Sequence, residues 1–390
     1  MSKAARIFIL CVLAALAEGY DLQSAGVAAP RFVPLFHLDP AHLSWVFGGN
    51  TFGLFLGAIA GGRLADQFGR RVVLIASLFA FGIFSIATAF APDASLLIAM
   101  RFLTGLGLGG ALPNIIAMTA EAAGEGKAAT RVTLVSSAMP FGGAIAGGIL
   151  ALWPDLGWQS VFWIGGILPL LVAAVMLKAL PESQDFARQD RIDAGRALWG
   201  EGRGLATLFL WVSFFFTLLV LYLMLNWLPS LLVARGFTRP QATLAALSFT
   251  LGGGIGGLII GSLAAVRWRG WLCAVTWGGM AAGMAWLALV GHDVVHAYLA
   301  AFVAGLFVIG GQFLLYGLSA EPYPSNLRAT GVGFAVGMGR LGSIAGPLFA
   351  GILLTAGRDP RTVLLGVVPM ILIALVATVW VGRRKPSLSR

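Results

Sequence analysis

Apolar residues are grouped into long runs that alternate with short polar breaks along the whole chain. A membrane-spanning helix needs about 20 mainly apolar residues, and about twelve runs reach that length. The pattern therefore predicts an all-α membrane protein with twelve transmembrane helices. They are expected near residues 7–29, 43–62, 72–91, 96–119, 132–152, 159–180, 205–230, 243–265, 271–290, 297–319, 329–354 and 361–381.

A polar segment in the middle of the chain separates six of these spans from the other six. Residues 182–204 form the longest stretch that is rich in charged side chains. We therefore expect an N-terminal six-helix bundle at residues 1–181, a cytoplasmic central loop at 182–204 and a C-terminal six-helix bundle at 205–390.

The two halves also repeat each other in sequence. When the chain is compared with itself at an offset of 200 residues, Gly105 matches Gly305, and Glu121 matches Glu321. Two six-span repeats in parallel orientation are the architecture of major facilitator transporters, whose substrate sites lie between the halves near the middle of the bilayer. The sequence thus predicts the major facilitator fold.

The composition excludes a soluble protein. Of the 390 residues, 58% are hydrophobic and 11% are charged, and the mean hydropathy is +0.89, whereas a soluble domain has about a quarter of its residues charged. The spans leave only short loops, so a separate enzymatic or nucleic-acid-binding domain has no room.

The net charge of +10 follows the membrane topology rather than a nucleic-acid partner. Nineteen of the 26 Lys and Arg residues fall at the two termini and in the loops on the same side as the termini, and five fall in the other loops. Because basic loops stay in the cytoplasm, we expect both termini there, in a multi-pass protein of the inner (plasma) membrane. Cys11 and Cys273 lie inside predicted spans, so no disulfide, metal or cofactor is predicted.

The loop between the second and third spans carries a motif. Its residues Gly62, Asp66, Gly69 and Arg70 belong to a segment that resembles the major facilitator signature G-x-L-a-D-r-x-G-r-r. With Glu121 at the same end of the fourth span, these residues are expected to latch one conformation. The second half has Ala265 in place of the acid, so we expect a latch in one half. The alternative interpretation is a tight turn whose arginines serve only topology.

Three charged residues in the first and fourth spans are expected at two depths. An arginine inside a span costs about 2.5–3.5 kcal/mol on insertion scales, so Arg101 needs a partner. A rise of 1.5 Å per residue places Asp21 and Arg101 about 8–9 Å from the outer face, and Glu18 about 16 Å deep. Arg340, in the eleventh span, also lies about 16 Å deep. An acid and a base from opposite halves are thus predicted to meet near the midplane, although Arg101 alternatively reaches a lipid headgroup.

Other polar groups inside spans also need partners in a membrane bundle. On this ground we predict substrate contacts from residues of the seventh and tenth spans, namely Tyr222, Asn226, Trp227, Gln312 and Tyr316.

The segment from Glu18 to Asp21, Glu-Gly-Tyr-Asp, is similar to the acid-Gly-x-Asp signature of the aromatic acid:proton symporters, and the chain most resembles their 3-(3-hydroxyphenyl)propionate branch. Segments at 105–114, 226–229, 304–312, 328–333 and 339–342 carry the resemblance over nearly the whole chain. It implies proton-driven uptake of an aromatic carboxylate, with Tyr20 and Gln23 beside the substrate. Tyr20, Gln67 and Ala265 depart from the pattern of that branch.

We therefore expect a monomeric transporter, not an enzyme, that works by alternating access. Arg340 would hold the substrate carboxylate, and Glu18 and Asp21 would carry the proton with Arg101 adjusting them. Burial disfavours the charged form of Glu18, whereas Arg101 favours the charged form of Asp21, so Glu18 is expected to titrate. The alternatives are a proton-antiport exporter of drugs or organic acids, and a non-transporting sensor of aromatic acids.

Overall fold

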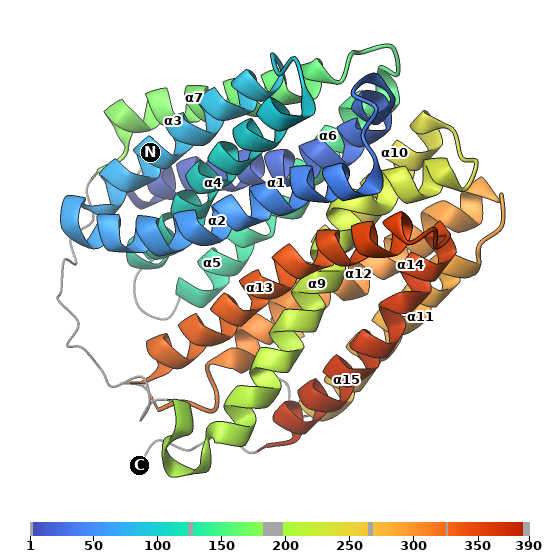
Figure 1. Ribbon diagram of the computed structural model, residues 1–390. Helices are drawn as coiled ribbons and strands as arrows, with labels where there is room; N and C mark the ends of the chain where they lie inside the picture. The colour runs from blue at the N-terminus through green and yellow to red at the C-terminus, as the bar shows by residue number, and fades with distance from the viewer. Residues whose placement is uncertain (1–2, 124–127, 182–197, 264–267, 325–326, 385–390) are drawn as a thin grey trace.

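Long helices run back and forth across the molecule, and both chain ends lie at the same end of the bundle (Figure 1). The computed structural model describes residues 3–123, 128–181, 198–263, 268–324 and 327–384. We call the end of the bundle that contains residues 3 and 384 the terminal end, and the opposite end, where helices begin at residues 40, 94, 159, 239, 294 and 360, the far end.

All secondary structure in these described residues is helical. The elements are α1 (Lys3–Leu35), α2 (Pro40–Phe68), α3 (Arg70–Thr88), α4 (Ala94–Ala123), α5 (Ala128–Ser136), α6 (Ala138–Leu152), α7 (Gln159–Ala179), η1 (Gly200–Gly202), α9 (Gly204–Ala234), α10 (Arg239–Ser262), α11 (Arg269–Leu289), α12 (Val294–Ser319), α13 (Arg328–Thr355), α14 (Pro360–Gly366) and α15 (Val368–Arg383).

Eleven segments between Pro40 and Arg383 are long and apolar enough to cross a membrane, within the part of the chain that the structure describes. The 33-residue helix α1 precedes them and packs against α6, α7, α9 and α4. The predicted all-α membrane protein is thus confirmed. Residues 182–197 lie outside the described residues, so the expected bounds of the central loop stay a prediction.

Two predicted spans are each divided into two helices. The fifth span breaks at Ser137 between α5 and α6, and the twelfth breaks at Val367 between α14 and α15. Pro140 and Pro369 follow these breaks by two or three residues. Proline lacks the N–H group and its ring clashes with the carbonyl four residues earlier, which explains an interruption at each place.

The sequence repeat recurs in the packing of the helices. A Cβ atom on Gly105 of α4 would lie 2.0 Å from the Asn50 carbonyl oxygen of α2, and one on Gly305 of α12 would lie 1.8 Å from the Phe249 carbonyl oxygen of α10. Glycine is required where two backbones approach so closely. The pairs α1·α6 and α9·α13 correspond in the same way, through contacts of Gly142 with Leu16 and of Gly342 with Phe215.

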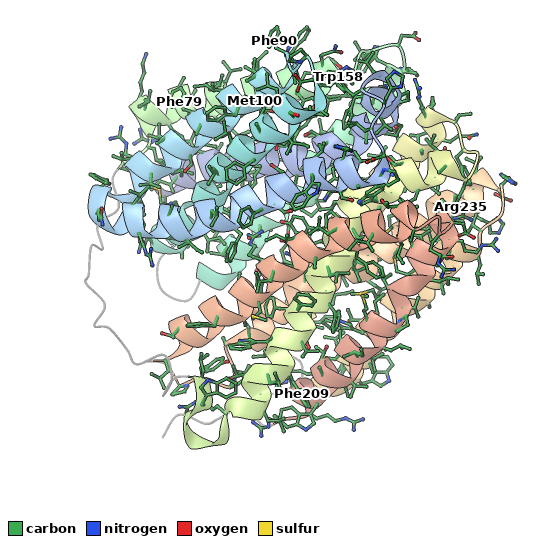
Figure 2. All side chains as sticks on the ribbon, viewed as in Figure 1. Phe79, Phe90, Met100, Trp158, Phe209 and Arg235 are labelled. Carbon is green, nitrogen blue, oxygen red and sulfur yellow. The ribbon has the colours of Figure 1, made fainter. Side chains whose placement is uncertain are left out.

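Arginines at the far end stabilise the ends of helices. Arg235 lies at this end of the C-terminal half (Figure 2) and donates hydrogen bonds to the carbonyl oxygens of Leu287 and Val290 at the end of α11. Arg31 donates to the carbonyl oxygens of Leu150, in the last turn of α6, and of Pro154, just after α6, at 3.3 Å each. Positive charge at the carboxyl end of a helix complements its dipole. These far-end arginines, which depart from the charge bias of the loops, therefore have a structural role.

Candidate functional site

A cavity of about 740 Å³ lies between the two halves of the molecule. It is lined by residues of α1, α2, α4, α5, α6, α9, α10, α12 and α13. Its lining continues to Val132, Gly261, Gly317 and Val332, each within a few residues of the terminal end of its helix. The cavity therefore extends from the middle of the bundle toward the terminal end.

At the far end the two halves are in close contact. A Cβ atom on Gly26 of α1 would lie 2.2 Å from the Leu225 carbonyl oxygen of α9. The rings of Phe47 in α2 and Trp227 in α9 meet edge to face, with their centroids 5.4 Å apart. Gly351 of α13 also packs against α2. These contacts close the cavity at the far end.

Arg340 presents a positive charge to the cavity. It lies on α13, which begins at residue 328, and its Nη1 donates a hydrogen bond of 3.0 Å to the phenolic oxygen of Tyr222 on α9. Both residues line the cavity. The guanidinium group offers further N–H donors in a planar fork, a geometry that matches a carboxylate.

Glu18 is a buried acid of the N-terminal half that interacts with this positive charge. Its side chain is 1% exposed, and its Oε2 has no hydrogen-bond partner among the described residues. Glu18 and Arg340, from opposite halves, interact electrostatically. A buried carboxyl group without a partner costs less in the neutral form than as a carboxylate. The acid and the base that the sequence singled out therefore interact across the two halves, while their position at the midplane stays a prediction.

Asp21 and Arg101 form a separate buried group. Arg101 donates to both carboxylate oxygens of Asp21, at 3.1 and 2.9 Å, and Ser85 donates to one of them at 3.0 Å. Both charged side chains are fully buried, and neither lines the cavity. Arg101 is therefore held by Asp21 rather than by a lipid headgroup.

Four of the other predicted substrate-binding residues line the cavity with Arg340, namely Gln23, Tyr222, Gln312 and Tyr316. The Gln312 amide donates to the Tyr316 hydroxyl at 3.2 Å.

Three predicted substrate-binding residues point elsewhere. Tyr20 packs against Gly165 of α7, the Asn226 amide donates to the Tyr222 carbonyl oxygen at 2.7 Å, and the Trp227 indole donates to the Pro347 carbonyl oxygen at 3.1 Å. None of the three lines the cavity. Their hydrophobicity and position in a span did not reveal which side of the helix they occupy.

The terminal end carries an ion pair in each half. Arg70 of α3 pairs with Glu121 of α4, next to Gly69, which has φ 92° between α2 and α3. Gly62 has open space around it, and the Asp66 side chain lies outside the described residues.

In the second half, Arg269 of α11 pairs with Glu321 after α12. An ion pair between neighbouring helices is therefore present in both halves, while the expected latch at Asp66, which has Ala265 as its counterpart, stays a prediction. Both partners follow the sequence repeat, since Glu321 corresponds to Glu121 at an offset of 200 and Arg269 to Arg70 at an offset of 199.

Two helical halves with repeated packing, a central cavity between them and a closed far end define a secondary transporter of the membrane. The profile of the Major Facilitator Superfamily matches residues 11–316, and the chain belongs to this superfamily. It is a transporter and not an enzyme.

Relatives and solved structures agree with this family. The chain is 43% identical to the 3-(3-hydroxy-phenyl)propionate transporter of Escherichia coli, over 94% of this chain and 91% of that protein. It is 31% identical to the 4-hydroxybenzoate transporter PcaK of Pseudomonas aeruginosa, over 97% and 92% of the two chains. A crystal structure of a variant of the nucleoside transporter NupG has the same fold, with a TM-score of 0.79, 14% identity and coverage of 97% and 100%.

Proposed function

We propose that the protein is a proton-coupled symporter that imports an aromatic carboxylate across the inner (plasma) membrane by alternating access. The observation that carries this proposal is the hydrogen bond from Arg340 to Tyr222 on the cavity wall, together with the electrostatic interaction of Arg340 with the buried Glu18, whose Oε2 has no hydrogen-bond partner among the described residues. The relatives named for 3-(3-hydroxy-phenyl)propionate and for 4-hydroxybenzoate support an aromatic acid as the substrate.

The carboxylate of the substrate binds Arg340. The guanidinium group already donates to Tyr222 at 3.0 Å, which fixes its orientation and leaves other N–H groups to face the cavity. The aromatic ring of the substrate packs against Phe55, Phe313 and Tyr316, which line the same cavity. Tyr20, Asn226 and Trp227 have no direct part in this binding.

Glu18 carries the coupled proton. A carboxylate at this position would compete with the anionic substrate for Arg340, so substrate binds when Glu18 is neutral. Release of the substrate lets Glu18 lose its proton to the side on which the cavity is open. Asp21 accepts hydrogen bonds from Arg101 and Ser85, and this buried group sets the position of α1, where Glu18 lies one turn away.

The positive-inside rule assigns the terminal end to the cytoplasm. The cavity then opens to the cytoplasm, and the closed far end faces outward. We propose that residues 1–181 and 205–390 move as two bodies joined by the loop at 182–204, as a monomer. The pairs Arg70–Glu121 and Arg269–Glu321 keep neighbouring helices of each half together during that motion.

Uptake into proteoliposomes tests the proposal. Purified protein is reconstituted, and entry of labelled 3-(3-hydroxyphenyl)propionate, 4-hydroxybenzoate and benzoate is followed with the outside at a lower pH than the inside. We expect concentrative uptake of at least one acid that a protonophore abolishes. Uptake that is unaffected by the protonophore would contradict proton coupling, and accumulation only when the inside is acidic would identify a proton antiporter.

A further inference from the structure

Gln23 is a buried polar side chain on the cavity wall with an unused acceptor. Its side chain is 1% exposed, it lines the cavity, and its Oε1 has no hydrogen-bond partner among the described residues. Buried polar atoms in native proteins nearly always have a partner, so an unpaired acceptor in a binding cavity points to a group that arrives with the ligand.

The helix crossing at Gly26 places Gln23 opposite the anion-binding side of the cavity. Gly26 of α1 touches the Leu225 carbonyl of α9, and both helices run from the terminal end toward the far end. Gln23 and Tyr222 each lie three residues, or about 4.5 Å, before that contact and on the same side of their helix. The two residues therefore lie at the same depth on opposite halves, beneath the closed far end.

The two sides of the cavity differ in their hydrogen-bonding character. On the C-terminal half, Arg340 offers N–H donors to an anion. On the N-terminal half, Gln23 offers an acceptor. Thr250, which like Gln23 lies against Gly143, donates its hydroxyl proton to the Ala246 and Leu247 carbonyl oxygens of its own helix, so this proton is already in a hydrogen bond. A ligand that satisfies both sides has a carboxylate at one end and an O–H donor at the other.

We propose that Gln23 accepts a hydrogen bond from a hydroxyl group on the substrate ring, and that the protein thereby selects hydroxylated aromatic carboxylates over unsubstituted ones. This inference rests on the proposed function, since it presumes that an aromatic acid occupies the cavity with its carboxylate on Arg340. The ligand would bridge the two halves, and its hydroxyl would lie toward α1.

The expected consequence is a difference in binding affinity between a hydroxylated acid and its unsubstituted analogue. An unsubstituted acid desolvates Gln23 without replacing its hydrogen bond, which penalises that acid relative to its hydroxylated analogue. One such hydrogen bond corresponds to a preference of about tenfold.

The test compares two pairs of acids on purified protein: 3-(3-hydroxyphenyl)propionate with 3-phenylpropionate, and 4-hydroxybenzoate with benzoate. Dissociation constants are measured by calorimetry for the wild type and for Gln23→Met, which keeps the length of the side chain but removes the amide. We expect the wild type to prefer the hydroxylated acid of at least one pair by about tenfold. In Gln23→Met that preference should fall to about one, mainly through weaker binding of the hydroxylated acid.

Thr250→Val is the matched control, because it changes a neighbouring polar residue whose hydroxyl is already used, and it should keep the wild-type preference. Binding of the unsubstituted acid by Gln23→Met shows that the variant is folded. Equal weakening of both acids in Gln23→Met, or an unchanged preference, would overturn the role of Gln23 while leaving the proposed function intact. A wild type that binds none of the four acids would instead refute the proposed function itself.

Discussion

Arg101 of α4 donates hydrogen bonds to both carboxylate oxygens of Asp21 on α1, at 3.1 and 2.9 Å, and the pair is completely buried. The Arg101 guanidinium group also lies 5.4 Å from the centre of the Phe162 ring of α7. Since neither charge lines the cavity, the pair links three helices of the N-terminal half instead of contacting substrate directly.

Removal of one partner of this pair should destabilise the protein more than removal of both. Arg101→Met leaves the Asp21 charge buried without compensation, and we expect a loss of about 3–5 kcal/mol in the free energy of unfolding. The double variant Asp21→Leu/Arg101→Met should recover much of that loss. Thermal unfolding in detergent measures both. A double variant that is as unstable as Arg101→Met would show that the site cannot be repacked without charge.

The equal depth of Asp21 and Arg101, which lets them pair, could be predicted from the sequence because depth depends only on helix rise and on where each span begins. The close packing of α2 with α4 and of α10 with α12 at glycines could likewise be predicted, since the repeat and the small residues are both visible in the sequence. These features follow from distances along one helix or from comparison of the two halves.

The side of the helix on which a side chain lies could not be predicted from the sequence. Tyr222 faces the cavity while Asn226 donates to the backbone of its own helix, although the two are one turn apart. In a span that is apolar on all sides, hydrophobicity does not distinguish the face toward the cavity from the face toward another helix. For the same reason, the sequence does not show that Trp227 lies against α13. Such contacts depend on the packing of the whole bundle.

Substitutions of Arg340 should change substrate affinity directly. Arg340→Ala removes the charge that pairs with the carboxylate and should cost about 2–5 kcal/mol of binding energy. Arg340→Lys keeps the charge but loses the planar fork, so severely weakened binding is expected. Tyr222→Phe keeps the ring and should give a smaller loss. Calorimetry on purified protein measures these affinities, and near-normal affinity in Arg340→Ala would exclude Arg340 from carboxylate binding.

Gly26→Ala should prevent closure of the far end. A Cβ atom at this position would lie 2.2 Å from the Leu225 carbonyl oxygen, so the contact between α1 and α9 cannot form unchanged. Overpacking of this kind costs about 1–3 kcal/mol, which shifts a conformational equilibrium by roughly 5- to 150-fold. Transport should therefore slow while the far end stays open.

Spin labels at Leu35 and Val295 report the far-end distance, because these residues are 60% and 63% exposed and belong to opposite halves. Cys11 and Cys273 are fully buried and should not react with the label. Gly148→Ala is the control, since no atom lies within 4 Å of its added Cβ. Identical distance distributions in Gly26→Ala and Gly148→Ala would refute the role of Gly26 in closure.

Acid should loosen the far-end starts of three helices. Hydrogen bonds from the backbone N–H groups of His42, His296 and Thr362 lower the pKa of Asp39, Asp293 and Asp359, respectively. A lowered folded-state pKa means that the stabilisation is present above the unfolded value of about 3.9 and is lost as the pH falls through the folded value.

Replacement of all three aspartates by asparagine tests this effect, because asparagine caps helices about as well but does not titrate. Near pH 7 the wild type and the triple variant should melt at similar temperatures. Below about pH 4 the melting temperature of the wild type should fall more than that of the triple variant. Parallel melting curves for the two proteins between pH 7 and pH 3 would contradict a contribution from these caps.

Glu18→Gln separates proton coupling from substrate movement. Glutamine resembles the protonated carboxyl permanently, so the cavity can still accept the anionic substrate beside Arg340. We expect the variant in proteoliposomes to lose accumulation driven by a pH gradient but to keep exchange of labelled for unlabelled substrate, because exchange needs no net proton release. Asp21→Asn is the matched comparison at the second acid of α1, and its effect should appear first in stability, since Arg101 loses its charged partner. If Glu18→Gln still concentrates substrate in a protonophore-sensitive way, the coupled proton is carried elsewhere, and Asp21 becomes the candidate.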